Sequence, residues 1–296
     1  MRYKIRDIVD IINISIKDPS NSDINIFVGL EHYDVGEPVI TRYGSTEMLT
    51  TAVKKFNSGD ILLARRNVYL RRAGKVDFDG VTSGDSIVIR VKSDLSKMLE
   101  CDSSVMKSLL PFILNTNAFW DYANTNSDGT MSKRLSPQLL LDYEFDLPPL
   151  AEQKVLADKL WAAYRLKESY KKLLAATEEM VKSQFIEMFG GGNWPQKCLG
   201  EVGSFTRGGG FQKSDFVEHG IPCIHYGQIH TKFGPFISSH ITEISSDLES
   251  KTKFASKGDL IVAITSEDAE GSCKSTAWLG DYPVAVGSHA AIYKHR

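Results

Sequence analysis

A long segment without glycine or proline, residues 151–189, constrains the fold of this chain more than any other feature. The segment is rich in Ala, Leu, Lys, Glu and Met, which favour helix. Pro148 and Pro149 precede it and Gly190 follows it, so we expect one helix of roughly 58 Å, at about 1.5 Å per residue. Its apolar residues recur at helical spacing, at Leu156, Leu160, Ala163, Tyr170, Leu174, Val181 and Met188. A core helix of a globular domain is the alternative, but such helices average about 11–12 residues, so the pattern favours a coiled coil with a partner helix.

The segments on either side of this helix resemble one another in the same order. Residues 2–11 resemble 195–205, residues 55–64 resemble 253–263, and residues 83–89 resemble 286–292. Chance similarity between β-rich segments is the alternative, but three matches in one order indicate a duplicated domain. Apolar runs at 61–64 and 87–91 are bounded by Gly, Asp and Ser, as buried strands are. The pairs Gly59-Asp60 and Gly258-Asp259 are interpreted as turns before strands, not as catalytic acids.

These patterns predict an α+β fold with two β-rich domains joined by a long coiled-coil-type helix. The expected ranges are 1–150 for the first domain, 151–190 for the helical spacer and 191–296 for the second domain. The second domain is expected to be incomplete, because Arg296 aligns near Lys92 of the first copy.

Composition excludes several classes of protein. No run approaches the roughly 20 apolar residues of a membrane span, and the N-terminus lacks the apolar core of a signal peptide. Four scattered cysteines without a CxxC pair argue against a disulfide scaffold and a thiolate metal site. We therefore expect a cytoplasmic protein. The net charge of −2 neither supports nor excludes a nucleic-acid binder, because positive charge can be concentrated locally.

Catalytic signatures are absent from the sequence. It contains no Walker A loop, no HExxH, and neither Asn-Pro-Pro-Tyr nor Asp-Pro-Pro-Tyr, the pocket motif of adenine methyltransferases. The glycines at 208–210 lack GxGxxG spacing. We therefore expect a binding protein without catalytic residues, metal or cofactor.

One junction is similar to a known family signature. The run Asp146-Leu147-Pro148-Pro149-Leu150-Ala151-Glu152-Gln153-Lys154 resembles the "PLPPLxEQ" motif of type I restriction specificity subunits, which lies where a target-recognition domain meets a helical spacer. Residues 129–135 resemble the small helical segment before that junction, and residues 220–229 resemble the family's "GIPxIRxGDI" run. The proline–glutamate–glutamine junction is fairly specific, and the other matches are loose.

The resemblance implies a function. In that family two recognition domains each read one half of a split double-stranded DNA site, and two antiparallel helices hold the domains apart. Modification subunits dock on this scaffold and methylate adenine, and an ATP-dependent restriction subunit cleaves DNA. A chain with one such helix implies association through residues 151–189, with another copy or a separate fragment. Two alternatives are a self-contained nuclease or methyltransferase, and a coiled-coil interaction protein or inactive relic that reads no DNA.

The strongest local concentration of positive charge follows the run at 61–64. Arginine can pair with guanine, asparagine with adenine, and lysine with phosphate, although a solvated surface loop is the alternative. The candidate DNA contacts in this segment are Arg65, Arg66, Asn67, Tyr69, Arg71, Arg72 and Lys75, and Arg42 is a weaker candidate.

Candidates in the second copy are fewer. Arg207 and Lys213 belong to a glycine-rich basic loop that could approach phosphates, and a plain mobile turn is the alternative. His225, Tyr226 and Gln228 offer base-reading or stacking chemistry, unless they are merely a polar strand end. Ser266 and Glu267 align with Arg65 and Arg66, where a glutamate would repel phosphate but could read cytosine.

Overall fold

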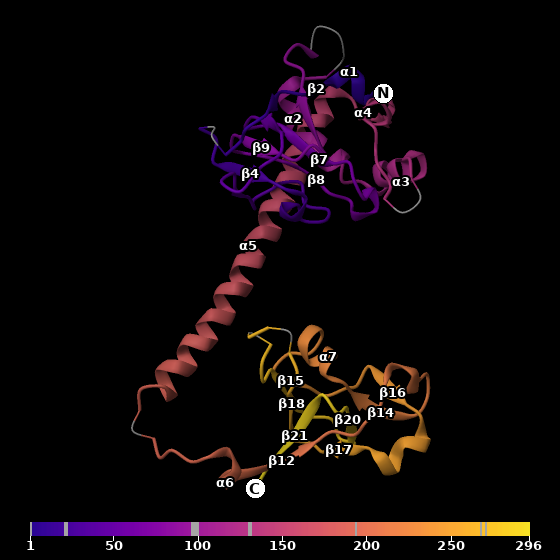
Figure 1. The fold of residues 1–296 in the computed structure, drawn as a ribbon. Coiled ribbons are helices and arrows are strands. Elements are labelled where there is room, and N and C mark those ends of the chain that lie inside the picture. Colours follow the sequence, from indigo (N-terminus) through magenta and orange to yellow (C-terminus); the bar gives the residue numbers. More distant parts are fainter. Residues whose placement is uncertain are drawn as a thin grey trace. The chain divides into compact units, whose positions relative to one another are not determined.

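The computed structural model divides into two compact units, Met1–Ser183 and Gln184–Arg296 (Figure 1). It describes residues 2–20, 23–95, 101–129, 132–192, 194–266, 268–269 and 271–296, and only the backbone of Lys213. Three residues that entered the sequence argument, Thr130, Met131 and Glu267, lie outside this range.

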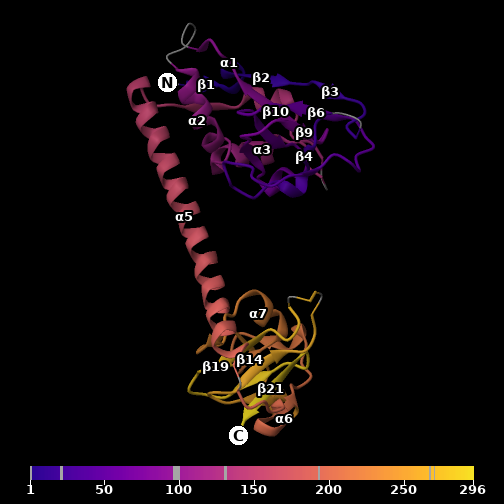
Figure 2. The ribbon, with the colours of Figure 1, turned by 90° about the vertical axis from the view of Figure 1, so that its left-hand side faces the viewer.

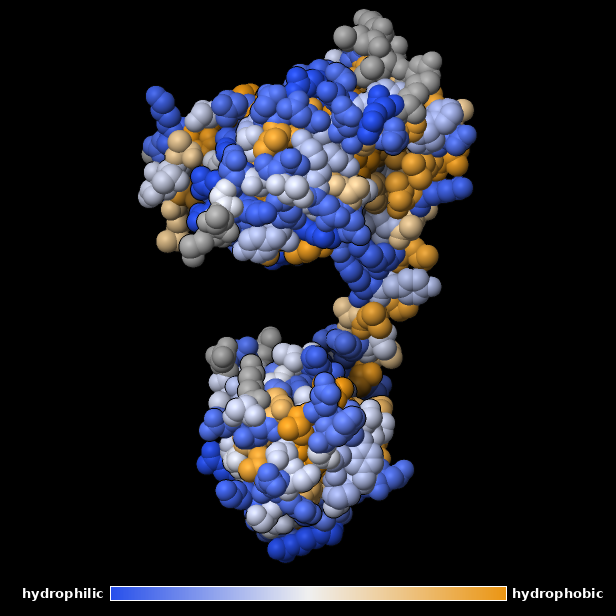
Figure 3. All heavy atoms as spheres, turned by 90° about the vertical axis from the view of Figure 1, so that its right-hand side faces the viewer, coloured by the Kyte–Doolittle hydropathy of each residue, from blue (hydrophilic) through white to orange (hydrophobic). Residues whose placement is uncertain are grey.

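The predicted long helix is α5, Leu150–Phe189, a single uninterrupted helix of 40 residues (Figure 2). Its first turn begins at the proline pair, where the Pro149 carbonyl accepts a 2.8 Å hydrogen bond from the Glu152 amide. Within the helix, Gln153 and Ala157 are buried against the first unit. Farther along, the apolar side chains of α5 are exposed, and Figure 3 shows them following the helix.

The first unit contains two main sheets and a small ladder. One sheet has the order β2-β10-β7-β8, the other β3-β6-β9-β4-β5, and β1 pairs with β11. Their strands are β1 (Arg2–Lys4), β2 (Val9–Ile12), β3 (Ser15–Ile16), β4 (Ile26–Val28), β5 (Gly44–Ser45), β6 (Val53–Phe56), β7 (Ile61–Ala64), β8 (Ala73–Lys75), β9 (Gly80–Thr82), β10 (Ser86–Val91) and β11 (Glu144–Asp146). The helices are α1 (Ile5–Ile8), α2 (Ser103–Ile113), α3 (Asn117–Asn126) and α4 (Pro137–Asp142), with short 3-10 turns η1 (Leu30–His32) and η2 (Val68–Leu70).

Strand β7 shows how the first unit is packed. Its side chains alternate between two cores, as strand geometry requires. Ile61 and Leu63 belong to the core shared with α2, α3 and α4, which includes Trp120. Leu62 and Ala64 belong to a second core on the other face of the sheet. Both faces are therefore covered, which explains the uninterrupted apolar run in the sequence.

The second unit also contains two sheets. Their orders are β12-β21-β18-β19-β15 and β13-β16-β14-β20-β17. The strands are β12 (Gly203–Arg207), β13 (Phe216–Val217), β14 (Ile221–Ile224), β15 (Phe236–Ile237), β16 (Thr242–Ile244), β17 (Lys253–Ala255), β18 (Leu260–Ala263), β19 (Ser275–Trp278), β20 (Val284–Val286) and β21 (Ala290–His295). The helices are α6 (Leu199–Val202) and α7 (Tyr226–Thr231), with 3-10 turns η4 (Lys213–Asp215) and η5 (Ser246–Lys251).

The two units repeat one topology. The order β2-β10-β7-β8 recurs as β12-β21-β18-β19, and the parallel pair β4·β9 recurs as β14·β20. Gly59 and Gly258 share a left-handed backbone, with φ of 89° and 92°. The next residue caps the turn in both units: Asp60 accepts from the Asn57 amide at 2.8 Å, and Asp259 from the Ser256 amide at 2.7 Å. These Gly-Asp pairs are turns before strands, as predicted.

The units differ in what covers the first sheet. Ile61 of β7 is 1% exposed, whereas its counterpart Leu260 of β18 is 38% exposed. Phe205 of β12 is also exposed. The face that packs against helices in the first unit is therefore open to solvent at these positions of the second.

Candidate nucleic-acid interface

The basic segment predicted from the sequence forms a tight turn between β7 and β8. The Arg65 amide donates to the Asp85 carbonyl at 2.9 Å, which places the segment beside the turn that precedes β10. Asn67 and Arg71 flank η2 with φ of 56° and 50°. A left-handed backbone is unusual for arginine, and such backbone strain is concentrated at functional sites.

A distant part of the chain holds this turn in place. The Leu135 amide donates to the Arg65 carbonyl at 2.9 Å, and the Asn67 amide donates to the Lys133 carbonyl at 2.9 Å. The Ser132 hydroxyl donates to Oδ1 of Asn67 at 3.0 Å. The turn is therefore fixed by backbone pairing with residues 132–135, not left as a solvated loop.

This pairing creates an arginine cluster, which we define as Arg65, Arg66 and Arg134. The carboxylate of Asp85 lies between two of its members, 3.7 Å from Arg66 and 3.3 Å from Arg134. Both guanidinium groups remain about half exposed. Lys54 adds positive charge nearby. Its burial is the main cause, and the positive charge of Arg65 the second cause, of a lowered pKa of its amine. The site thus offers several cations around one carboxylate, with planar donors suited to base edges and phosphates.

The described ion pairs and hydrogen bonds of the other basic candidates in this segment are with groups other than the Asp85 carboxylate. Arg71 donates to Oδ1 of Asn117 at 2.7 Å. Arg72 donates to the Leu30 carbonyl at 2.9 Å, and burial lowers the pKa of its guanidinium. Lys75 lies 2.6 Å from Asp77, and its amine is 6.0 Å from the ring centre of Trp161 on α5.

Tyr69 and Arg42 are two further candidates for DNA contact in the first unit. Tyr69 is exposed in the middle of η2. Arg42 makes a 2.7 Å ion pair with Asp34, and its described contacts are not with the arginine cluster.

In the second unit, Arg207 ends β12 and donates through Nε to the Ser288 carbonyl at 2.9 Å. His225 precedes α7, and its Nδ1 accepts from the Gly227 amide at 3.2 Å. Tyr226 is partly exposed at the first position of α7. The side chain of Lys213 lies outside the described residues.

Gln228 does not present its amide to the surface. It is only 4% exposed; its Oε1 accepts from the His225 amide at 3.0 Å, and its Nε2 donates to Thr242 at 2.9 Å. In the first unit His32 caps Gly29 in the same way, at 2.9 Å. The expectation that Gln228 reads bases is therefore corrected: it is a capping residue whose donor and acceptor are both used within the domain.

The alignment of Ser266 and Glu267 with Arg65 and Arg66 is also wrong. The Ile264 amide donates to the His289 carbonyl at 3.0 Å, as the Arg65 amide does to Asp85. Ile264 therefore occupies the position of Arg65, and the second unit has no arginine there.

Sequence reasoning missed Arg134 as a candidate for DNA contact. It lies in the run that resembles the family's segment before the spacer, which was the available signal. Among the described residues there is no His, Cys, Asp or Glu cluster suited to a metal ion. None of the helices in the described part of the chain has the length and apolar character needed to cross a membrane.

Comparison with known proteins defines the fold further. No family model and no curated protein matches the sequence. Among solved structures, all of this chain aligns with 75% of a chain from a study of complex assembly and conformational transition of the type I R-M system, at 18% identity and a TM-score of 0.54.

The chain therefore shares the fold of that chain of the type I R-M system. Two further similar structures are the HsdS subunit from Thermoanaerobacter tengcongensis (18% identity, all of this chain and 75% of that one, TM-score 0.44) and the type I restriction-modification S subunit from M. genitalium (10% identity, all of this chain and 72% of that one, TM-score 0.44). The α+β architecture predicted from the sequence, two β-rich domains and a long helix, is confirmed.

Proposed function

We propose that this chain recognises double-stranded DNA as the non-catalytic specificity subunit of a type I restriction–modification complex. The observation that carries the proposal is the arginine cluster beside Asp85, fixed by backbone pairing on a fold shared with a chain of a type I R-M system. A preorganised cluster loses little conformational entropy on binding, so its charge contributes to affinity.

The residues divide by the part of DNA that they fit. Arg66 and Arg134 project planar donors that can pair bidentately with guanine or hold phosphates. Tyr69 offers an exposed ring and hydroxyl at the tip of the same turn. Arg72 and Lys75 instead brace the domain, because the former donates to a backbone carbonyl and the latter lies near Trp161.

Helix α5 fits the role of spacer and docking element. Its exposed apolar stripe includes Leu166, Tyr170, Leu173 and Val181, side chains that a partner helix would remove from water. We propose that this partner is a second copy or a separate fragment, that modification subunits which methylate adenine dock on the assembled helices, and that an ATP-dependent restriction subunit joins them.

The proposal is tested by co-expressing the chain with its modification subunit and mapping methylated adenine in the host DNA. A split motif with an unspecified spacer supports it; a palindromic split motif means that two copies assemble and each reads with its first domain.

An Arg66→Glu/Arg134→Glu variant should abolish this methylation, and Arg2→Glu serves as the control, because Arg2 lies on the separate β1–β11 ladder. Absence of methylation by the unaltered chain would leave the inactive-relic alternative.

A further inference from the structure

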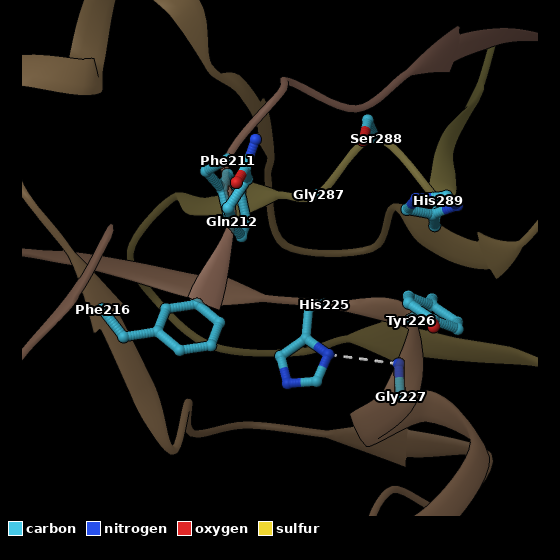
Figure 4. A pocket seen from close by; sticks show the side chains of 9 residues that line it. All are labelled: Phe211, Gln212, Phe216, His225, Tyr226, Gly227, Gly287, Ser288 and His289. Carbon is cyan, nitrogen blue, oxygen red and sulfur yellow. Dashed lines mark hydrogen bonds between the residues drawn. The ribbon is translucent and has the colours of Figure 1, made fainter. Parts of the chain in front are cut away.

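A pocket of about 390 Å³ opens in the second unit, and aromatic rings form most of its wall (Figure 4). The rings belong to Phe211, Phe216, His225, Tyr226 and His289. They come from three separate segments, which the fold brings around one opening.

The rings are arranged as two walls. On one side Phe216 and His225 are stacked, with centroids 5.5 Å apart and an interplanar angle of 27°. On the other side the Tyr226 and His289 rings lie 5.0 Å apart. The Thr265 hydroxyl lies 3.0 Å from Nδ1 of His289, a hydrogen bond that orients this imidazole.

A glycine keeps the pocket open. Gly287 is a buried lining residue next to Phe211 (Figure 4), and a Cβ at this position would lie 3.3 Å from the Phe211 ring. A longer side chain there would occupy the space. The guanidinium of the exposed Arg207 is held by its hydrogen bond to the carbonyl of Ser288, one of the lining residues.

The pocket occupies the position that corresponds to the arginine cluster of the first unit. The turn 287–289 is the counterpart of 83–85, because the Ile264–His289 hydrogen bond repeats Arg65–Asp85. The segment at His225 is the counterpart of Gly29, because both are capped by the residue three positions later. The edge that carries cations in one unit therefore carries aromatic rings in the other.

We propose that this pocket receives an unpaired base of the bound DNA. The inference rests on the proposed function, because it places the pocket on the DNA-facing edge. Bases taken out of the stack are bound between aromatic side chains, and their edges are read by nearby polar groups. Here Gln212 and Ser288 supply such groups. The exposed Arg207, which donates to the Ser288 carbonyl, supplies a cation for the adjoining phosphate.

The lining favours a base over an apolar protein segment. Among the described residues that line it there is no aliphatic side chain, which a groove for leucine-type anchors would offer, and no carboxylate, which would repel phosphates. A planar heteroaromatic ring attached to an anionic backbone fits both features.

The test measures binding of the full chain to three labelled probes of equal length: a mixed-sequence single strand, an abasic strand and a duplex. We expect the base-bearing single strand to bind more tightly than the abasic strand. Tyr226→Ala and His289→Ala should each weaken its binding by about 5- to 150-fold, the range for loss of one stacked base, and leave abasic binding unchanged. Phe236→Ala removes an exposed ring outside the pocket and should have no effect.

Equal affinity for base-bearing and abasic strands, or unaltered single-strand binding by both pocket variants with wild-type melting curves, would overturn the pocket assignment. Binding to the duplex probe distinguishes failure of the pocket assignment from failure of the proposed function. Duplex binding that depends on the arginine cluster, without base-dependent single-strand binding, removes only the pocket. Base-dependent single-strand binding without any duplex binding keeps the pocket and removes the specificity role.

Discussion

Nη2 of Arg134 lies 3.3 Å from Oδ1 of Asp85, although the two residues belong to different halves of the first unit. The contact completes a site that begins with Arg65 and Arg66, because residues 132–135 pair with the turn that carries them. Asp85 therefore orients the guanidinium groups and partly neutralises them.

We expect Arg134→Gln to weaken duplex binding at low salt and to reduce its salt dependence. Each phosphate contact contributes about 0.9 to the slope of log K against log salt, so the loss of one contact should lower the slope by about that amount. Titrations of a labelled duplex at several salt concentrations measure it. Arg2→Gln removes an exposed arginine from the separate β1–β11 ladder and is the matched control. An unchanged slope for Arg134→Gln would place the DNA-binding face elsewhere.

Asp85→Asn should have the opposite effect. Removal of its negative charge leaves Arg66 and Arg134 without their carboxylate, so the local positive potential rises. We expect tighter non-specific duplex binding with a steeper salt dependence, together with reduced discrimination between sequences, because the guanidinium groups are less firmly oriented. Weaker binding at every salt concentration would mean that Asp85 matters chiefly for folding of the turn.

Because the two units repeat one topology, equivalent strand positions in them can be compared in a test of stability. Ile61→Ala should destabilise the first unit by about 2–5 kcal/mol, because it leaves a cavity in a covered core. Leu260→Ala, at the corresponding position of the second unit, should cost less than about 1 kcal/mol, because that side chain is already partly solvated. Hydrogen exchange resolved along the chain reports each unit separately. Equal losses would show that the outer face of β18 is covered in solution.

The sequence was most informative where one local pattern determines one local structure. Helix α5, the strand at 61–64 and the Gly-Asp turns follow from composition, periodicity and the left-handed backbone that glycine permits. The association of Arg134 with Arg66 depends instead on closure of a long loop, and no local pattern encodes it. Gln228 was misread for another reason. It lies three residues after His225, a spacing typical of a helix cap, but only its polar side chain was considered.

Helix α5 is tied to the first unit by a carboxylate that should titrate. Glu37 lies 2.6 Å from Lys167 and 2.9 Å from Lys171. Burial raises the pKa of Glu37, but the hydrogen bonds from the two lysines outweigh it and hold the pKa below its ordinary value. Because the pKa is lowered in the folded state, the contact stabilises that state at pH values above the pKa of glutamate in the unfolded chain, about 4.3. This stabilisation is lost as the pH falls through the lower pKa of the folded state.

We therefore expect Glu37→Gln to loosen residues 164–172 at neutral pH by about 0.2–1 kcal/mol, the range for exposed ion pairs. Hydrogen exchange at pH 7 measures the difference between variant and wild type. Acidification below the lowered pKa of folded Glu37 should abolish this difference, because wild-type Glu37 is then protonated as well. A difference that persists in acid would assign the effect to packing.

The apolar stripe of α5 leads to the last expectation, self-association in solution. Leu173 is 60% exposed on this stripe, and burial of such side chains against a second helix is favourable in proportion to the area removed from water. We expect the chain to exceed its monomer mass at micromolar concentration in sedimentation analysis, and Leu173→Asp to return it to the monomer. Ala175→Asp makes the same change in charge at an exposed position and should leave the assembly intact, because that residue lies on the opposite side of the helix from Leu173. A monomeric wild-type chain would favour a separate fragment as the partner of α5, and dissociation by both variants would indicate a general charge effect instead of a helix–helix seam.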